Sequence, residues 1–298
     1  MNVTKVVIPS AGAGTRWAPL TYAGNVPTLM PKEMVPVGSR PGISYVVDEA
    51  VSSGCSHVVV IANAHKNAIA DYFEKVQSPA QFVYIPQIKP LGLGHAVLMA
   101  QPAIHNEYFG VILPDELLLG PKPGLGQLIE VAMREKASVI AVCEVPWAQV
   151  SSYGVVSLKQ QLAPNIFEIG GLVEKPKREE APSNLMISGR YVLSPKIFDS
   201  LRSIKPGAKG EFQLTDAIAD MLSKGERVLA CKVEGVRYDI GTPLGWTKAV
   251  IGLSLQDPTY RDEIIRFIMN ECSLQPSKNE HLAGIMPAQK VPEKPLAL

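Results

Sequence analysis

The stretch that decides the fold is VVIPSAGAGTRWAPL, residues Val6–Leu20. Its β-branched start predicts a buried strand, and the glycines at positions 12 and 14 predict a tight turn directly after it. Glycine lets such a turn bring free backbone N–H groups close to a ligand, and these groups form a concave site for an anion. The turn indicates a phosphate loop, with an ordinary glycine turn as the alternative.

Two well-known phosphate loops do not fit this turn. A dinucleotide-binding loop needs a small third residue where its helix packs on the strand, and Trp17 stands at that position. A Walker A loop needs a GxxxxGK motif followed by Ser or Thr, which is absent here. A dinucleotide-dependent oxidoreductase is therefore disfavoured, and Arg16 supplies positive charge at the end of a different kind of loop.

Outward from this loop, the first half of the chain alternates apolar strands with helices. The predicted strands are Val6–Pro9, His57–Ile61, Phe82–Ile85, Gly110–Leu113 and Ser138–Val145. The predicted helices are Ile43–Val51, Asn67–Val76, Gly94–Ala103 and Leu125–Lys136. Nearly continuous apolar strands that alternate with helices indicate a parallel sheet covered on both faces.

The pattern changes in the second half of the chain. Between Gly154 and Leu193, strand-like segments follow one another without helices, which predicts an antiparallel extension that walls a cleft. Helices return at Pro195–Arg202, Gln213–Ser223 and Pro243–Leu255. We therefore predict an α/β fold with a Rossmann-like mixed, mainly parallel sheet flanked by helices and a small antiparallel β extension.

Composition excludes several classes of function. The chain has 298 residues and a net charge of +1, so no global field attracts nucleic acid or an anionic membrane. It has no signal-peptide pattern and no apolar run long enough to span a bilayer, so we expect a cytoplasmic protein. The four cysteines and five histidines are scattered without disulfide or metal-ligand spacing, and we expect reduced thiols.

Two further segments carry side chains suited to a nucleotide. In MPKEMVPV, Lys32 offers a point charge for phosphate; a solvated lysine is the simpler alternative, but Arg16 and Lys32 bracket the same loop. In YIPQIKPLGLGHAV, the Gln87 amide can donate and accept at the edge of a base, and Gly92 lets backbone approach it. A plain strand–helix loop is the alternative there, with His95 as a packing residue at the helix start.

Carboxylates stand where predicted strands end. Asp115 follows the strand in GVILPDELLL, at the edge where open α/β sheets gather their ligands. A carboxylate there suits Mg²⁺, which takes hard oxygen donors and few protein ligands, although a capping role is the alternative. Asp239 is a second carboxylate at a strand end, in VRYDIGTPLGW. In GLVEKPKREEAPSN, Glu174 can accept sugar hydroxyls and Lys175 can contact a phosphate.

Together these motifs resemble the sugar-phosphate nucleotidyltransferase family. GAGTR, PKEM, LGLGHAV, YGVV, VEKPK, APSN, GRYVL, GEFQLTDAI and RYDIG follow its pattern in order, between Val6 and about Leu255. Each motif alone is weak, but this many in the right order are specific. The resemblance implies that the chain makes UDP-glucose and pyrophosphate from UTP and glucose-1-phosphate, with Mg²⁺ as cofactor.

The resemblance also implies roles for individual residues. Nucleotide contacts are implied for Ala11, Gly12, Gly14, Thr15, Gln87 and Gly92, the last two at uracil. Sugar-phosphate contacts are implied for Gly154, Glu174, Lys175 and Gly189. Catalytic roles are implied for Arg16, Lys32, Asp115 and Lys175, with Mg²⁺ shared by Asp115 and Asp239.

The implied organisation is one catalytic domain at residues 1–256, with a nucleotide-binding half at about 1–150 and a sugar-binding half at about 151–256. Residues 257–298 are expected to form a C-terminal helix, at Tyr260–Met269, and a flexible tail from about Cys272. The helix and tail could form the interface of a homo-oligomer, a dimer or a tetramer.

The sequence departs from the family pattern in places. Extra residues, APLTYAGNVPTLM, separate Arg16 from Lys32, Tyr22 aligns with a lysine common in relatives, and Glu116 stands where relatives often have Asp. These changes bear on loop closure and nucleotide preference more than on the class of reaction. The alternatives are a thymidylyltransferase, another hexose-1-phosphate nucleotidyltransferase, or a non-catalytic nucleotide-sugar-binding paralogue.

Overall fold

The computed structural model describes residues 2–23, 26–27, 30–63, 67–207 and 210–273. The chain divides into two compact units, Met1–Ala249 and Val250–Leu298. The first unit contains all strands found among the described residues, and the second contains the end of helix α8 (Pro243–Gln256) and helix α9 (Arg261–Ser273). Within the described residues, no helix is long and apolar enough to cross a membrane.

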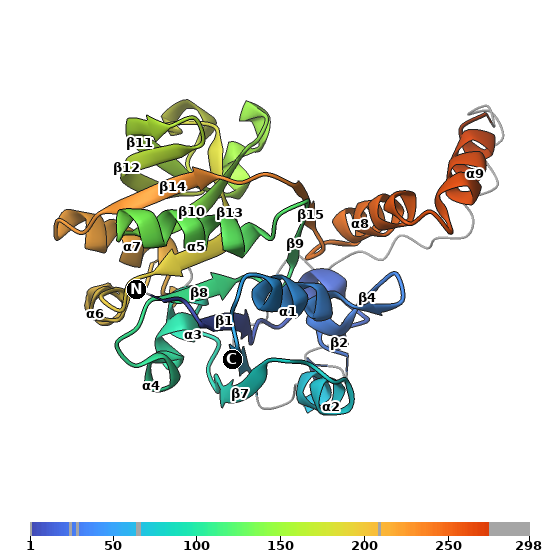
Figure 1. Cartoon of the computed structure of the whole chain (residues 1–298), viewed down its shortest axis with the longest axis horizontal. Coiled ribbons are helices and arrows are strands. Elements are labelled where there is room, and N and C mark those ends of the chain that lie inside the picture. Colours follow the sequence, from blue (N-terminus) through green and yellow to red (C-terminus); the bar gives the residue numbers. More distant parts are fainter. Residues whose placement is uncertain (1, 24–25, 28–29, 64–66, 208–209, 274–298) are drawn as a thin grey trace. The chain divides into compact units, whose positions relative to one another are not determined.

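A nine-stranded mixed sheet forms the middle of the first unit, in the order β10-β14-β12-β11-β13-β8-β1-β6-β7 (Figure 1). Its strands are β1 (Lys5–Ser10), β6 (His57–Ala62), β7 (Gln81–Pro86), β8 (Phe109–Ile112), β10 (Ser138–Glu144), β11 (Gly154–Ala163), β12 (Ile166–Glu174), β13 (Leu185–Leu193) and β14 (Val228–Lys232). Strands β8, β1, β6 and β7 are parallel, whereas β13 runs antiparallel to both β8 and β10. The predicted α/β class is confirmed.

The antiparallel extension is not a separate sheet. Strand β13 lies between β8 and β11 and also pairs with β10, so β10, β14, β12, β11 and β13 form a closed ring of paired strands. The extension is therefore continuous with the parallel half, and β13 connects the two.

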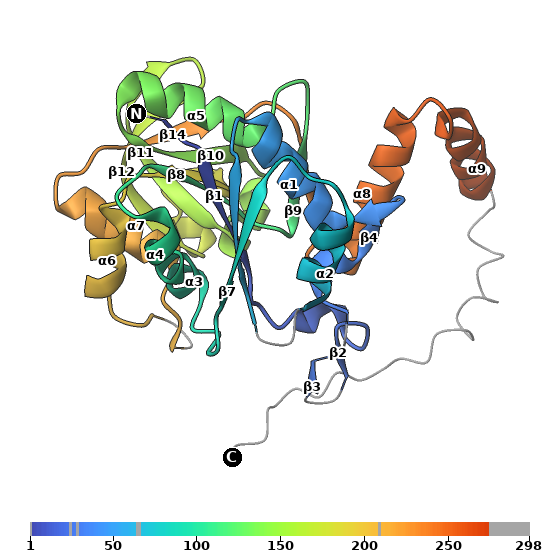
Figure 2. The same ribbon diagram turned by 60° about the horizontal axis from the view of Figure 1, so that its bottom comes forward.

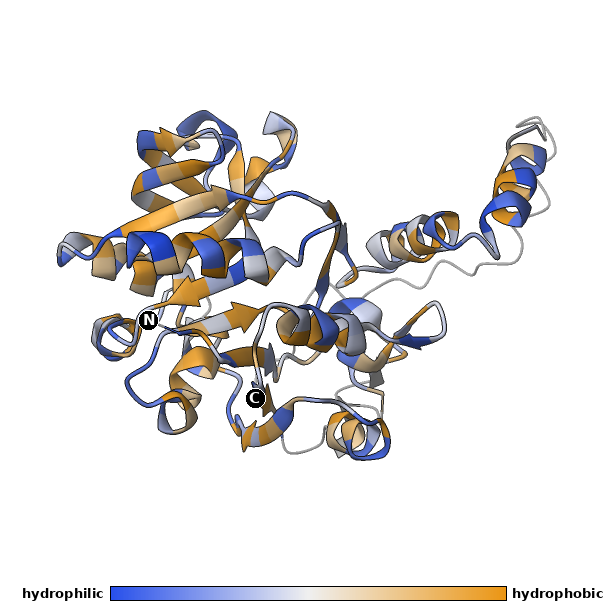
Figure 3. Cartoon of the chain, viewed as in Figure 1, coloured by the Kyte–Doolittle hydropathy of each residue, from blue (hydrophilic) through white to orange (hydrophobic). Residues whose placement is uncertain are grey.

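Helices cover both faces of the sheet. They are α1 (Gly42–Ser52), α2 (Asn67–Lys75), α3 (Leu93–Met99), α4 (Gln101–Ile104), α5 (Gly124–Glu135), α6 (Ile197–Ser203) and α7 (Leu214–Ser223). In Figure 2, α5 lies above the strands, and α3, α4, α6 and α7 lie below them. Val7 and Val59 belong to the apolar cluster with α3, α6 and α7, whereas Gly110 faces Leu125 of α5. Figure 3 accordingly shows strands such as β8 and β14 as mostly apolar.

Three elements differ from the prediction. The helix expected at Gly94–Ala103 is divided into α3 and α4, because Pro102 lacks an N–H and its ring clashes with the preceding turn. The short strand β9 (Glu116–Leu119) and the sheet strand β14 were not predicted. Strand β9 pairs only with β15 (Val236–Asp239), and this small ladder helps to build the site described below.

The remaining elements are short. They are the strand pairs β2 (Tyr22–Ala23) with β3 (Val26–Pro27) and β4 (Pro36–Val37) with β5 (Arg40–Pro41), and the 3-10 turns η1 (Thr15–Trp17), η2 (Lys32–Met34), η3 (Trp147–Ser152) and η4 (Arg178–Glu180). The insertion between Arg16 and Lys32 is described only in part, since residues 24–25 and 28–29 lie outside the described residues. The predicted flexible tail lies outside them too, beyond Ser273.

Candidate nucleotide and sugar site

The phosphate loop leaves the carboxyl end of β1 and turns at Gly14, whose φ of 72° is a conformation that favours glycine. The chain then enters η1, where Trp17 N donates a hydrogen bond to Gly14 O at 2.9 Å. The indole Nε1 of Trp17 donates to Ile240 O at 3.2 Å, and its ring packs edge-on against Trp246 with centroids 5.9 Å apart. Trp17 therefore fastens this loop to the segment that follows β15.

A cavity of about 450 Å³ opens beside this loop. It is bordered by residues from the carboxyl ends of β1, β7 and β8, the edge at which open α/β sheets bind ligands. Of the residues singled out in the sequence, it brings together Ala11, Gly12, Gly14, Thr15, Lys32, Gln87, Gly92 and Asp115. Residues far apart in the chain thus surround one space of the size that small-molecule sites have.

Gln87 and Gly92 occupy the wall formed after β7. The Gln87 side chain is buried, and its Nε2 lies 2.6 Å from Nδ1 of His95 and 3.4 Å from the carbonyl oxygen of Gly92. Gly92 has a φ of 99°, and a Cβ there would stand 2.8 Å from the Phe212 carbonyl oxygen. A side chain at position 92 would therefore force apart the turn and the segment that precedes α7.

The two candidate phosphate cations both contact Asp115. Lys32 Nζ lies 2.6 Å from Asp115 Oδ2, and Arg16 Nη2 lies 3.6 Å from the same oxygen. Burial alone would raise the pKa of Asp115, but the Lys32 and Arg16 charges hold it below its usual value. Burial alone would lower the pKa of Lys32, but Asp115 and Glu33 raise it above its usual value. Both partners of this ion pair are therefore charged.

The ladder of β9 with β15 brings the two candidate metal ligands together. It pairs Glu116 with Asp239, so Asp115 and Asp239 lie at the same end of the ladder. A Cβ added at Gly241 would stand 3.0 Å from both Arg16 Nη2 and Asp115 Oδ2, and 3.1 Å from Asp239 Oδ1. Both carboxylates therefore border the small space that this glycine leaves open.

This donor set fits Mg²⁺, which usually takes one or two carboxylates and completes its shell with water and phosphate oxygens. No group of three or more His, Cys, Asp or Glu side chains within the described part of the chain could hold a metal ion by itself. Asp115 and Asp239 thus suit a cation shared with a bound phosphate.

A second cavity, of about 170 Å³, adjoins the first, since Leu93 and Leu113 border both. Gly154, Glu174 and Lys175 border it, as the sequence analysis had grouped them. Lys175 Nζ lies 3.2 Å from Glu174 Oε1, and its side chain is mostly exposed. A carboxylate beside an exposed ammonium offers groups for both hydroxyls and a phosphate.

Gly189 does not border either cavity. A Cβ on Gly189 would meet Leu113 at 3.1 Å and the Glu116 carboxyl carbon at 3.3 Å, so this glycine leaves room for residues that do. Tyr153 and Thr215 also border the smaller cavity and were not predicted; Thr215 donates to Glu174 Oε2 at 3.2 Å. No local sequence pattern indicates this contact, because Thr215 and Glu174 lie on separate elements that meet only after folding.

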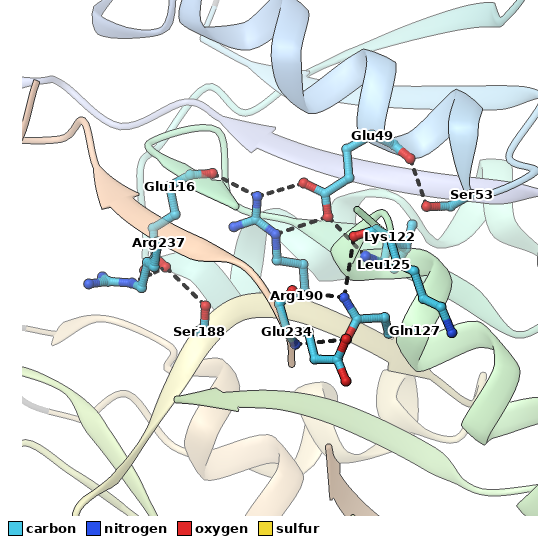
Figure 4. A network of polar contacts seen from close by, with 10 residues as sticks. All are labelled: Glu49, Ser53, Glu116, Lys122, Leu125, Gln127, Ser188, Arg190, Glu234 and Arg237. Carbon is cyan, nitrogen blue, oxygen red and sulfur yellow. Dashed lines mark hydrogen bonds and ion pairs between the residues drawn. The ribbon is translucent and has the colours of Figure 1, made fainter. Parts of the chain in front are cut away.

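A buried polar network lies behind the site (Figure 4). Arg190, which is fully buried, donates to Glu49 through Nε at 3.1 Å and Nη2 at 2.7 Å, and Nη2 also donates to the Glu116 carbonyl oxygen at 2.9 Å. Arg237 Nε donates to Glu116 Oε2 at 2.7 Å, and Ser188 Oγ lies 3.4 Å from the same oxygen. The network thus joins α1, β13 and β15 to the residue next to Asp115.

Known proteins similar to this chain give an independent indication of its function. The family model described as "Nucleotidyl transferase" matches residues 5–251. UTP–glucose-1-phosphate uridylyltransferase 2 of Staphylococcus saprophyticus is 40% identical over 289 residues, which cover 90% of this chain and 97% of that protein.

Solved structures agree in fold over most of the chain. The UTP-bound UGPase from Acinetobacter baumannii is 34% identical with a TM-score of 0.81, covering 92% of this chain and 100% of that one. A UDP-glucose pyrophosphorylase complexed with UDP-glucose is also 34% identical, with a TM-score of 0.78, covering 86% of this chain and 100% of that one.

Proposed function

Because the chain belongs to the nucleotidyl transferase family, we propose that it makes UDP-glucose and pyrophosphate from UTP and glucose-1-phosphate. The observation that carries the proposal is the pair of adjoining cavities, which share Leu93 and Leu113. The larger one is bordered by the phosphate loop and Lys32, with Arg16 in contact with Asp115 on its wall, and the smaller one has Glu174 beside Lys175. Two anionic substrates bound there would meet end to end.

The proposed reaction is an in-line displacement. An oxygen of the sugar phosphate forms a bond to the α-phosphorus of UTP, while the bond between that phosphorus and the bridging oxygen breaks and pyrophosphate leaves. The attacking phosphate has a second pKa of about 6, so it is already an anion near neutral pH and needs no general base. The protein must position two anions and stabilise the charge on the pyrophosphate.

The residues divide this work by their positions. Arg16 and Lys32, beside the phosphate loop, would stabilise the triphosphate and the leaving pyrophosphate, and Lys175 would orient the attacking phosphate. Asp115 and Asp239 would hold Mg²⁺, which supplies Lewis-acid polarisation of a phosphoryl oxygen when it is bound. Glu174, oriented by Thr215, would accept hydrogen bonds from sugar hydroxyls.

The test is pyrophosphate release from UTP and glucose-1-phosphate in the presence of Mg²⁺. Replacing UTP with dTTP, and glucose-1-phosphate with galactose-1-phosphate, distinguishes a uridylyltransferase from its relatives. No pyrophosphate with any of these pairs would refute the proposal, and nucleotide binding without turnover would instead identify a non-catalytic paralogue.

The same proposal extends to the cell and to assembly. UTP and sugar phosphates are charged metabolites that do not cross membranes unaided, so we place the enzyme in the cytoplasm, where they are made. Helix α9 exposes Phe267 and Met269, and α8 exposes Leu244, which gives each helix apolar surface for a second copy. A dimer or tetramer in light scattering of the purified chain would support this assembly, and a monomer would contradict it.

A further inference from the structure

The side-chain amide of Gln87 is fixed in one orientation. The side chain is only 3% exposed, and both hydrogen bonds that it makes within the described part of the chain start from Nε2. One runs to Nδ1 of His95 at 2.6 Å and the other to the Gly92 carbonyl oxygen at 3.4 Å. An amide nitrogen has two hydrogens, so both are used inside the protein, and the carbonyl oxygen is the group left for a ligand.

His95 is neutral in this arrangement. Its Nδ1 accepts the proton of Gln87, so the proton of the ring is on Nε2. His95 is the third residue of α3, and the positive end of a helix disfavours an imidazolium ion. Burial also lowers the pKa of His95 below its usual value. While the ring keeps its proton on Nε2, the opposite orientation of the amide would place an oxygen against the accepting Nδ1.

Turning the Gln87 amide by half a turn would lose both contacts. It would place the amide oxygen against the Gly92 carbonyl oxygen, and also against an accepting Nδ1 of His95 unless the ring moved its proton from Nε2 to Nδ1. Buried polar groups left without partners carry their full desolvation penalty. His95 therefore makes Gln87 a hydrogen-bond acceptor at the wall of the nucleotide cavity.

We propose that His95 is a positioning residue for base selection, and that through Gln87 it favours bases with an N3–H donor over cytosine. This inference rests on the proposed function, in which Gln87 reads the base. Uracil and thymine present N3–H to an acceptor, whereas N3 of cytosine is itself an acceptor and would face the Gln87 oxygen. A site built around one hydrogen bond rejects a base that cannot make it.

The experiment measures the dissociation constants of UTP and CTP by calorimetry with Mg²⁺, for the wild type, His95→Ala and His95→Asn. His95→Ala should lower the preference for UTP over CTP about tenfold, which corresponds to about 1.4 kcal/mol, because the amide becomes free to turn. His95→Asn should keep most of the preference, since its Oδ1 can accept in place of Nδ1. The matched control is His57→Ala, at the far end of β6.

Two results would overturn the inference. One is a wild type that binds CTP as well as UTP, and the other is a folded His95→Ala with an unchanged preference. The tautomer of the His95 ring is a second test, and it can be measured on the wild type without any variant. In ¹⁵N NMR at neutral pH, His95 should carry its proton on Nε2, and a proton on Nδ1 would contradict the mechanism.

Binding and turnover are separate readouts. A protein that prefers UTP but releases no pyrophosphate would refute the proposed function and leave base selection by His95 supported. A protein that turns over UTP and CTP equally well, with equal affinities, would support the proposed nucleotidyl transfer and refute base selection by His95.

Discussion

Replacing Arg190 with methionine should destabilise the protein by about 3–5 kcal/mol, the usual cost of removing one partner from a buried ion pair. The guanidinium is fully buried and makes two hydrogen bonds to Glu49 and one to the Glu116 carbonyl oxygen. Without it, the Glu49 carboxylate keeps its hydrogen bond from the Leu125 amide at 2.9 Å but has lost its charge partner. The penalty is that of a buried charge left uncompensated.

The native pair itself adds less to stability than this cost suggests. Nη1 of Arg190 is buried without a hydrogen-bond partner among the described residues, so part of the free-energy cost of removing the guanidinium from water is not offset. Replacing both partners by apolar side chains of similar size removes every buried charge and is often neutral or stabilising. Glu49→Met combined with Arg190→Met should therefore be more stable than Arg190→Met alone.

The assay is urea unfolding of the wild type, both single variants and the double variant, read as a double-mutant cycle. Arg202→Met is the matched control, because Arg202 pairs with Asp199 at the surface and should change the free energy of unfolding by less than about 1 kcal/mol. Two results would refute the reasoning. One is an Arg190→Met protein whose free energy of unfolding is within about 1 kcal/mol of the wild type. The other is a double variant that is no more stable than Arg190→Met. Turnover is the second readout, since Arg190 also holds the residue beside Asp115.

Lys32→Ala should lower turnover about 10²–10³-fold in the pyrophosphate assay, because one preorganised charge contact is worth about that much, and exposed Lys75→Ala should not. Gly241→Ala should raise the Mg²⁺ concentration for half-maximal activity several-fold, since its methyl would stand 3.0 Å from Asp115 Oδ2; an unchanged Mg²⁺ titration would contradict the site. Burial lowers the pKa of His95, so below about pH 6.5 the unfolded chain binds a proton that the folded one resists. As the pH falls below about 6.5, the melting temperature of the wild type should therefore drop more than that of His95→Asn. Equal drops in the two melting temperatures would contradict this prediction.

The parallel part of the sheet was predictable because its inner strands, such as β6 and β8, are buried on both faces. All four residues of the run Val58–Ile61 are buried. A continuous apolar run of this kind is easy to recognise as a strand in the sequence. Strand β9 was missed because it is only four residues long and begins with the charged Glu116. Its partner among the described strands, β15, also lies far along the chain. Short strands whose pairing is this remote carry almost no local signal.

Some residues of the candidate site could likewise be predicted from the sequence, and others could not. Residues beside glycine turns and strand ends, such as Gln87 and Asp115, were visible because backbone geometry determines where ligands bind. Thr215 and the orienting contact from His95 were not visible, because they depend on side chains that meet only after folding. The sequence also suggested two free phosphate cations, whereas Lys32 and Arg16 both contact one carboxylate.

That last difference has a consequence for the proposed reaction. Asp115 and an incoming triphosphate compete for Lys32, whose side chain is 15% exposed and lies 2.6 Å from the carboxylate. If Lys32 moved to the phosphates, Asp115 would be left as a partly buried carboxylate with only the Arg16 contact at 3.6 Å, which is costly. A divalent cation bound at Asp115 together with the nucleotide would remove this cost, because it would give the carboxylate a new partner in place of Lys32. Under the proposed function, the ion pair would therefore make nucleotide binding and metal binding depend on each other.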